Sequence, residues 1–489
     1  MWIEVSGQTP ILTARLIPAM KAPEDAEAFI TILRRETMRV RLLKYWDRLQ
    51  ASFWFVPGIM AVGAVALVFT TVYMDEALMR QGWEKDWSFV YTGGAEGASS
   101  VLGTIAGSMM TIAGVVFSMT LVALTLASSQ FGPRLLRNFM SDTSNQVVLG
   151  TFVATFLYCV LVLRTIRYSG ENGFVPHLSV TLGVLFALAS MGVLIYFIHH
   201  VSVSIQADEI IRRVSAELAQ GIDRMFPEEA EARESEEEPG STADAPRFPD
   251  REARPATASG DGYLQFVDID ALVRLGARED LVIQLVKRPG HYIFGDSILA
   301  LVWPAHSFDT KLEAEVNAAM ILGHQRTPTQ DIEFAIHQLV EIAVRALSPG
   351  VNDPYTAIRC VDRLGSALCR LARRHAPTPF HRDKENRIRV IETPVTFPAI
   401  VDAAFDQIRQ NARSTAAVTI RLLETIAVIA ACVHRKEDRS ALRRQADIIA
   451  RGAQEGLAEA EDRRDVQERL QEVIAALRDL EGTMDPGRP

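Results

Sequence analysis

Four long stretches without a charged residue dominate the first two hundred positions of the chain. They run from Ser52 to Met74, from Gly103 to Phe131, from Val147 to Leu163 and from Leu178 to Ile198. A bilayer core of about 30 Å is crossed by about 20 apolar residues in helical conformation. The pattern therefore predicts four transmembrane helices within residues 51–200, preceded by an N-terminal segment at residues 1–50. Buried helices of a soluble core rarely show four such runs in succession.

After the fourth run the pattern becomes amphipathic and then polar. Apolar residues recur at helical spacing between Gln206 and Phe226, which predicts a helical extension over residues 201–226. Residues 227–260 combine many glutamates with Pro, Ala and Ser. Such a composition cannot bury a core, so we predict an acidic disordered linker there.

The remaining residues predict a small β-rich module followed by helices. Between 261 and 305, alternating stretches such as Leu281–Val286 and Ile298–Trp303 predict strands. Residues 306–489 predict a helical domain without an internal repeat, and its helices are expected at Asp331–Leu347, Phe397–Arg413, Ala416–His434 and Arg439–Leu480. The expected fold class is an α-helical integral membrane protein with a cytoplasmic α+β domain, in which a helical bundle follows the small β-rich module.

Basic residues predict the orientation in the membrane, because they concentrate on the cytoplasmic side of short loops. They precede the first run at Arg34, Arg35, Arg39, Arg41, Lys44 and Arg48. They also follow the second run at Arg134 and Arg137 and the fourth at Arg212 and Arg213, whereas the loop from Asp75 to Glu96 is mainly acidic. Only Arg164 and Arg167 contradict this trend. We therefore predict a multi-pass protein of the bacterial inner (plasma) membrane with both termini in the cytoplasm.

Composition excludes several classes of function. The net charge of −9 argues against binding of nucleic acid. The four cysteines are too few and too scattered for a disulfide framework or a Cys-rich zinc module. Phosphate-binding glycine loops, HExxH, GxSxG and Cys-x-x-Cys are absent from the sequence. We therefore predict no catalytic residues, no metal site and no cofactor, and we expect that the protein is not an enzyme.

Two blocks of sequence resemble a known family. The first comprises Phe117–Leu124, Ala127–Phe139 and Leu149–Phe152, and the second is the segment Ala346-Leu-Ser-Pro-Gly-Val-Asn-Asp-Pro354. Together they resemble the bacterial predicted membrane proteins grouped as domain of unknown function 2254, from about residue 38 to the mid-400s. The resemblance implies an integral membrane protein of the bacterial cell envelope, and it implies no particular activity.

Hydroxyl groups follow one face of the second apolar run. Steps of alternately four and three residues connect Thr104, Ser108, Thr111, Val115, Ser118, Val122, Thr125 and Ser129. A polar face within a membrane must meet a neighbouring helix or water. One interpretation is helix packing, helped by the nearby Gly103, Gly107 and Gly114; the other is a hydrated pore lined by Thr104, Ser108, Thr111, Ser118 and Thr125.

Three further features have a structural and a functional interpretation. Arg134 and Arg137 anchor the helix end, or they form the cytoplasmic mouth of a pore or contact lipid headgroups. The adjacent His199 and His200 suit an interfacial position better than a shared metal ion, because they point about 100° apart on a helix. In the Ser348–Pro354 loop, Asp353-Pro354 predicts a helix start, and no base or nucleophile pair stands at a recognisable spacing.

The functional hypothesis from sequence is a homo-oligomeric, channel-like pore lined by the second transmembrane helix. It depends on the hydroxyl face, on the lack of charge within the apolar runs and on the absence of a catalytic set. The expected partners are the lipid bilayer, further copies of the chain and a permeant ion or small solute. The alternative is a non-conducting, membrane-anchored scaffold or signalling protein whose cytoplasmic domain binds a partner or ligand.

Overall fold

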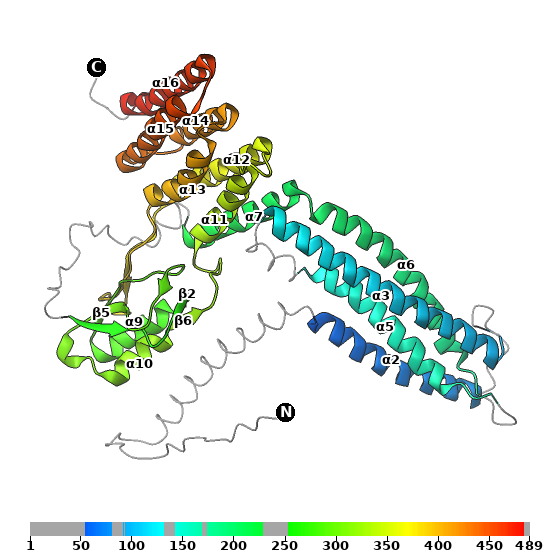
Figure 1. Ribbon diagram of the computed structural model, residues 1–489. Helices are drawn as coiled ribbons and strands as arrows, with labels where there is room; N and C mark the ends of the chain where they lie inside the picture. Colours follow the sequence, from blue (N-terminus) through cyan, green and yellow to red (C-terminus); the bar gives the residue numbers. More distant parts are fainter. Residues whose placement is uncertain are drawn as a thin grey trace, which may run out of the picture. The chain divides into compact units, whose positions relative to one another are not determined.

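The computed structural model describes residues 54–80, 91, 93–131, 142–168, 174–227 and 253–483 (Figure 1). The chain divides into two compact units. The first unit contains the described residues up to Val116 and those from Asp142 to Val193, and the second contains residues 117–131 and those from Leu194 onward. The predicted N-terminal segment at residues 1–50 lies outside the described residues.

Four helices are long and apolar enough to cross a membrane, as predicted: α2 (Phe55–Arg80), α3 (Ala95–Phe131), α5 (Thr143–Thr165) and α6 (His177–Ser204). Each extends beyond its uncharged run, because polar residues at the ends of a run continue the helix. One consequence is a correction. The sequence analysis assigned Asp75 to the acidic loop after the first run, but the structure places it inside α2.

Within the first unit, α2 packs along α5. The two helices come close at Gly150, where an added Cβ would lie 3.2 Å from the Cα of Pro57. The core of this unit centres on Tyr158, which is fully buried and meets the ring of Phe186 edge-on at 5.1 Å between centroids. Small and aliphatic residues of α2, α3 and α6 surround it. The packing thus joins segments of all four apolar helices.

The predicted amphipathic extension is helix α7 (Ala207–Met225). Its apolar face, which includes Ile211, Val214 and Leu218, is buried against α11 (Ile332–Ala346) and α12 (Pro354–Ala372). In the second unit α7 is therefore part of the helical core.

The β-rich module contains two sheets. The five-stranded sheet has the order β1 (Arg254–Thr257), β5 (Ile298–Trp303), β3 (Val282–Leu285), β8 (Ile388–Ile391) and β7 (Phe380–Arg382). All neighbouring strands are antiparallel except β3 and β8. The smaller sheet has the order β4 (Tyr292–Ile293), β2 (Gly262–Val267) and β6 (Met320–Gly323). Helices α9 (Ile269–Glu279) and α10 (Thr310–Ala318) and the short 3-10 helix η6 (Ala305–Ser307) complete the module.

This module differs from the predicted one at both ends. Strand β1 lies within residues 227–260, which we predicted to be linker, while residues 228–252 lie outside the described part. Strands β7 and β8 lie between α12 and α13 (Phe397–Ala412), inside the segment predicted to be helical. Both strands are short: β7 has three residues, and the four residues of β8 are flanked by polar and charged positions, so their sequence alone carries little strand signal.

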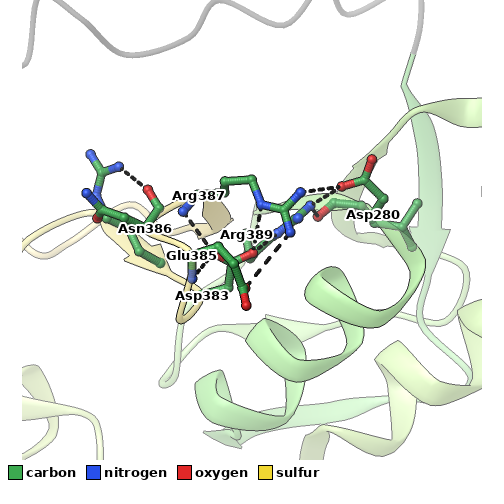
Figure 2. A network of polar contacts seen from close by, with 8 residues as sticks. Asp280, Asp383, Glu385, Asn386, Arg387 and Arg389 are labelled. Atoms are coloured by element: carbon green, nitrogen blue, oxygen red, sulfur yellow. Dashed lines mark hydrogen bonds and ion pairs between the residues drawn. The ribbon is translucent and has the colours of Figure 1, made fainter.

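A buried arginine fixes the β7–β8 hairpin to the rest of the module (Figure 2). Nε of Arg389 donates to Oδ2 of Asp383 at 2.6 Å, and Nη1 donates to Oδ1 of Asp280 at 2.8 Å. Asp383 also accepts the backbone N–H groups of Glu385 and Arg387, which shapes the turn. These bonds tie the turn of the hairpin to Asp280, which lies in the left-handed conformation at the end of α9.

The helical region is a stack of three helical hairpins, α11–α12, α13–α14 and α15–α16. Helices α14 (Ala416–Ala430), α15 (Lys436–Gly456) and α16 (Ala460–Thr483) complete it. The odd-numbered helices pack on one another in order, and so do the even-numbered ones. This is the two-layer arrangement of an α-solenoid. The predicted single helix Arg439–Leu480 is wrong: it is divided after Gly456, where the chain passes too close to the backbone of Arg413 for a side chain.

Candidate functional site

The hydroxyl face predicted on the second apolar run is a continuous surface of α3. Thr104, Ser108, Thr111, Ser118 and Thr125 are all exposed within a single 37-residue helix. The opposite face of α3 is buried and consists of small or aliphatic residues, among them Ala98, Leu102, Ala106, Met109, Ala113 and Val116. The helix therefore buries mainly small and aliphatic residues, and it turns the hydroxyl face outward together with exposed apolar residues such as Met110 and Leu121.

The threonine hydroxyls of this face are bonded within their own helix. Thr104 donates to the carbonyl of Ser100 at 2.8 Å, Thr111 to that of Gly107 at 3.0 Å, and Thr125 to that of Leu121 at 2.9 Å. Each hydroxyl hydrogen is thus engaged, and each oxygen still offers a lone pair to the outside. The nearby Gly103, Gly107 and Gly114 have free space around them, because no heavy atom lies within 4 Å of the position that an added Cβ would take.

The predicted basic mouth cannot be placed in this structure. Arg134 and Arg137 lie outside the described residues, which stop at Phe131 and resume at Asp142.

A second polar group, in the first unit, was not predicted as a site. Asp75 is 6% exposed, and its carboxyl oxygens accept the N–H groups of Leu178 at 2.8 Å and Ser179 at 2.9 Å and the hydroxyl of Ser179 at 2.6 Å. These N–H groups belong to the first turn of α6, so a side chain from α2 caps another helix. The Tyr158 hydroxyl, which lies 3.2 Å from that of Thr71, donates to the Ser179 carbonyl at 3.1 Å.

Within the second unit, the residue that directly precedes the second motif block contacts the first block. Nη1 of Arg345, near the end of α11, donates to the carbonyls of Ser128 at 3.1 Å and Ser129 at 2.7 Å. These carbonyls lie in the last turn of α3, where backbone oxygens have no partner in their own helix and attract a cation. Arg345, which directly precedes the second block, thus caps the helix that contains the start of the first block.

A polar cavity of about 1000 Å³ lies beside this contact. Its lining comes from α11, from the loop after α11 and from the end of α13, and it includes Ser129, His337, Arg345, Ser348 and Asn411. Arg326, also in the lining, is paired with Asp331 through bonds of 2.7 and 2.8 Å.

The loop Ser348–Pro354 has structural roles. Asp353 caps α12 by accepting the backbone N–H of Thr356 at 3.1 Å and its hydroxyl at 2.6 Å. The hydroxyl of Thr356 is the main reason that the pKa of Asp353 is lowered. Ser348 donates to the carbonyl of Arg345 at 2.6 Å, and Asn352 takes the left-handed conformation with φ of 48°. These bonds turn the chain from α11 into α12.

The structure offers no metal site among its described residues, where no three His, Cys, Asp or Glu side chains gather. His200 stacks on Tyr196 and lies 3.4 Å from the hydroxyl of Ser204. Asp75 and Arg345 are the residues that sequence reasoning missed. The available signal was a charged residue directly after an apolar run for Asp75 and one residue before the end of a helix for Arg345. The spacing along the sequence did not identify the partner of either residue.

Comparison with known proteins agrees with the motif resemblance. The sequence model of the family described as "Predicted membrane protein (DUF2254)" matches residues 50–428. The uncharacterized proteins Rv1290c of Mycobacterium tuberculosis and Mb1321c of Mycobacterium bovis are each 33% identical to this chain over 434 residues, which cover 85% of this chain and 79% of the relative. No solved structure matches the chain. The chain belongs to the DUF2254 family of predicted membrane proteins.

Proposed function

We propose that this member of the family forms a homo-oligomeric, channel-like pore in the bacterial inner membrane. In this proposal α3 of each copy lines the axis, and both termini lie in the cytoplasm. The observation that carries it is the exposed hydroxyl face of α3, which lies opposite the face that is buried in the chain's own core.

The length of the face suits a bilayer. Twenty-one residue steps separate Thr104 from Thr125, and at a helical rise of 1.5 Å they span about 32 Å. The hydrocarbon core of a bilayer is about 30 Å thick. A face of this length exposed to lipid would leave the oxygens of five hydroxyl residues in hydrocarbon, whereas an axis shared by several copies would place them against water.

The chemistry of the face indicates what would pass. Because the hydrogens of Thr104, Thr111 and Thr125 are engaged by backbone carbonyls, the face presents oxygen lone pairs. Such a lining is weakly polar and has no fixed charge. It suits water and small solutes or ions that tolerate oxygen ligands, as in pores lined by neutral oxygen donors. No catalytic step is part of this proposal.

The test is single-channel recording of the purified protein in a planar bilayer. The Thr111→Leu/Ser118→Leu variant removes two hydroxyls near the middle of the face, and we expect it to abolish or strongly reduce the current while the oligomer mass is unchanged. Thr111→Ser/Ser118→Thr keeps the hydroxyls and should conduct. Met110→Leu, on an exposed position about 100° away on the helix, is the matched control.

The second candidate is a non-conducting scaffold or signalling protein. It is favoured by the solenoid of α11 to α16, because stacked helical hairpins provide extended surfaces that bind other proteins. The same variants separate the two candidates. If Thr111→Leu/Ser118→Leu dissociates the oligomer, the face is a packing interface. If the wild-type protein stays silent over a range of voltage, tension and pH, the scaffold becomes the better explanation.

A further inference from the structure

A groove with an apolar wall and a basic end lies on the first unit between α2 and α5. Its volume is about 1260 Å³, which exceeds the pockets of about 300–1,000 Å³ that hold drug-sized ligands. Val65, Val68, Phe69 and Val72 line it along α2. Its other lining includes three arginines, Arg80 in the last turn of α2 and Arg164 and Arg167 at the end of α5.

These arginines have little compensating charge. Arg164 and Arg167 are exposed, and neither has an ion-pair partner in the part of the chain that the structure describes. Arg80 lies 4.0 Å from Glu76, the one carboxylate in the lining, and both side chains are more than half exposed. Among the described residues that line it, the groove therefore carries an excess of positive charge at one end.

Their position is also unusual for a membrane protein. In the predicted topology Arg164 and Arg167 lie on the outer side, where short loops generally lack arginine. Anchoring in the cytoplasmic leaflet therefore does not account for them. A ligand with negative charge at this end of the groove does account for both arginines.

We propose that this groove binds one phospholipid with an anionic headgroup, of the phosphatidylglycerol class. An acyl chain lies along the apolar wall from Val65 to Val72, and the phosphodiester lies against Arg164 and Arg167. Guanidinium groups match phosphate oxygens in pairs of hydrogen bonds. Tyr73, which is 74% exposed in the same lining, has the amphipathic ring typical of the headgroup level.

The dimensions of the groove agree with one leaflet. The eight residue steps from Val65 to Tyr73 rise about 12 Å along the helix, close to half of a bilayer core of about 30 Å. A second copy of the chain is the other conceivable occupant. It would have to desolvate the arginines and supply carboxylates for them, which is costly for charges without partners.

The experiment is native mass spectrometry of the full-length protein in mild detergent, titrated with dioleoylphosphatidylglycerol or dioleoylphosphatidylcholine. One arginine near an anionic lipid contributes about a fivefold change in affinity. We expect the wild-type protein to prefer phosphatidylglycerol by roughly 25-fold through its two arginines, and Arg164→Gln/Arg167→Gln to lose that preference. Arg212→Gln, which removes an exposed arginine outside the groove, is the matched control.

A second variant distinguishes binding of the lipid within the groove from binding to basic residues of the surface alone. Val72→Trp fills the apolar wall and keeps all three arginines, and it should also lower phosphatidylglycerol binding. Ile59→Trp, on an exposed position of α2 outside the lining, should not. Equal binding of the two lipids by the wild-type protein would overturn the proposal, and so would unchanged binding by Val72→Trp. A lower oligomer mass for Val72→Trp would instead assign the groove to a second copy.

Discussion

Asp75 offers the most direct test of how the first unit is held together. Its carboxyl group, on α2, accepts two backbone N–H groups and one hydroxyl at the start of α6. Replacing a capping side chain by alanine costs about 0.5–2 kcal/mol, and each buried N–H left without an acceptor costs about 1–3 kcal/mol. Hydrogen bonds between membrane helices lie at the lower end of such ranges. We therefore expect Asp75→Ala to lower the free energy of unfolding by about 3 kcal/mol.

Asp75→Asn should cost less, because the amide oxygen can still accept the N–H of Leu178 and the NH₂ group can donate to the hydroxyl oxygen of Ser179, so that only the N–H of Ser179 loses its acceptor. The expected loss is about 1 kcal/mol. For a domain of this size, 1 kcal/mol corresponds to about 2–4 °C in Tm. Thermal unfolding of the purified protein in detergent should therefore show Tm falling by roughly 6–12 °C for Asp75→Ala and by a few degrees for Asp75→Asn.

Glu76→Ala is the matched control, because Glu76 is the exposed neighbour of Asp75 in α2. Hydrogen exchange provides a local measurement, since the amides of Leu178 and Ser179 should lose protection in Asp75→Ala. The reasoning is refuted if Asp75→Ala unfolds at the same temperature as Glu76→Ala, or if both Asp75 variants are equally destabilised.

Two further predictions concern Arg345, which directly precedes the second motif block, and Asp353 within that block. Arg345→Ala removes two charge-assisted hydrogen bonds, worth about 1.5–3 kcal/mol each, so hydrogen exchange of the amides in the last turn of α3 should become faster. Arg345→Lys should give an exchange rate between those of the wild-type protein and Arg345→Ala. Unchanged exchange in Arg345→Ala would contradict the cap. The pKa of Asp353 is lowered, mainly by the hydroxyl of Thr356, so its stabilisation of α12 is present above the carboxyl's ordinary pKa and is lost as pH falls through the lowered value. Asp353→Asn still caps the helix, so its stability should match that of the wild-type protein near pH 7. On acid titration the variant should lose less stability than the wild-type protein. Parallel curves of stability against pH would disprove the role of the ionised Asp353 carboxyl group.

Much of the architecture follows from local pattern. The four apolar runs and the amphipathic helix α7 are determined by hydrophobic period, and the starts of α11, α12 and α13 by capping residues, and both act over a few neighbouring positions. Where the prediction failed, a contact with residues distant in the sequence determined the local structure. Strands β7 and β8 pair with a sheet formed about a hundred residues earlier, and the break after Gly456 reflects the approach of Arg413.

The candidate sites likewise include features that follow from local sequence and features that depend on distant contacts. The alternating spacing of Thr104, Ser108 and Thr111 places them on one face of a helix, because helical geometry alone determines which residues share a side. Whether that face is buried or exposed depends on which side of α3 the other helices cover. Likewise the partners of Asp75 and Arg345 lie roughly a hundred and two hundred residues away, and no local pattern pairs them.

The sequence by itself determined the four helices that are long and apolar enough to cross a membrane, the family and the hydroxyl face, because the hydropathy and the helical period are properties of short stretches. Only the tertiary structure decided that the hydroxyl face of α3 points outward, that α2 caps α6 through Asp75, and that three arginines share a groove with an apolar wall. The physical reason is that burial and pairing of polar groups depend on neighbours brought together by packing, and those neighbours are distant in the chain.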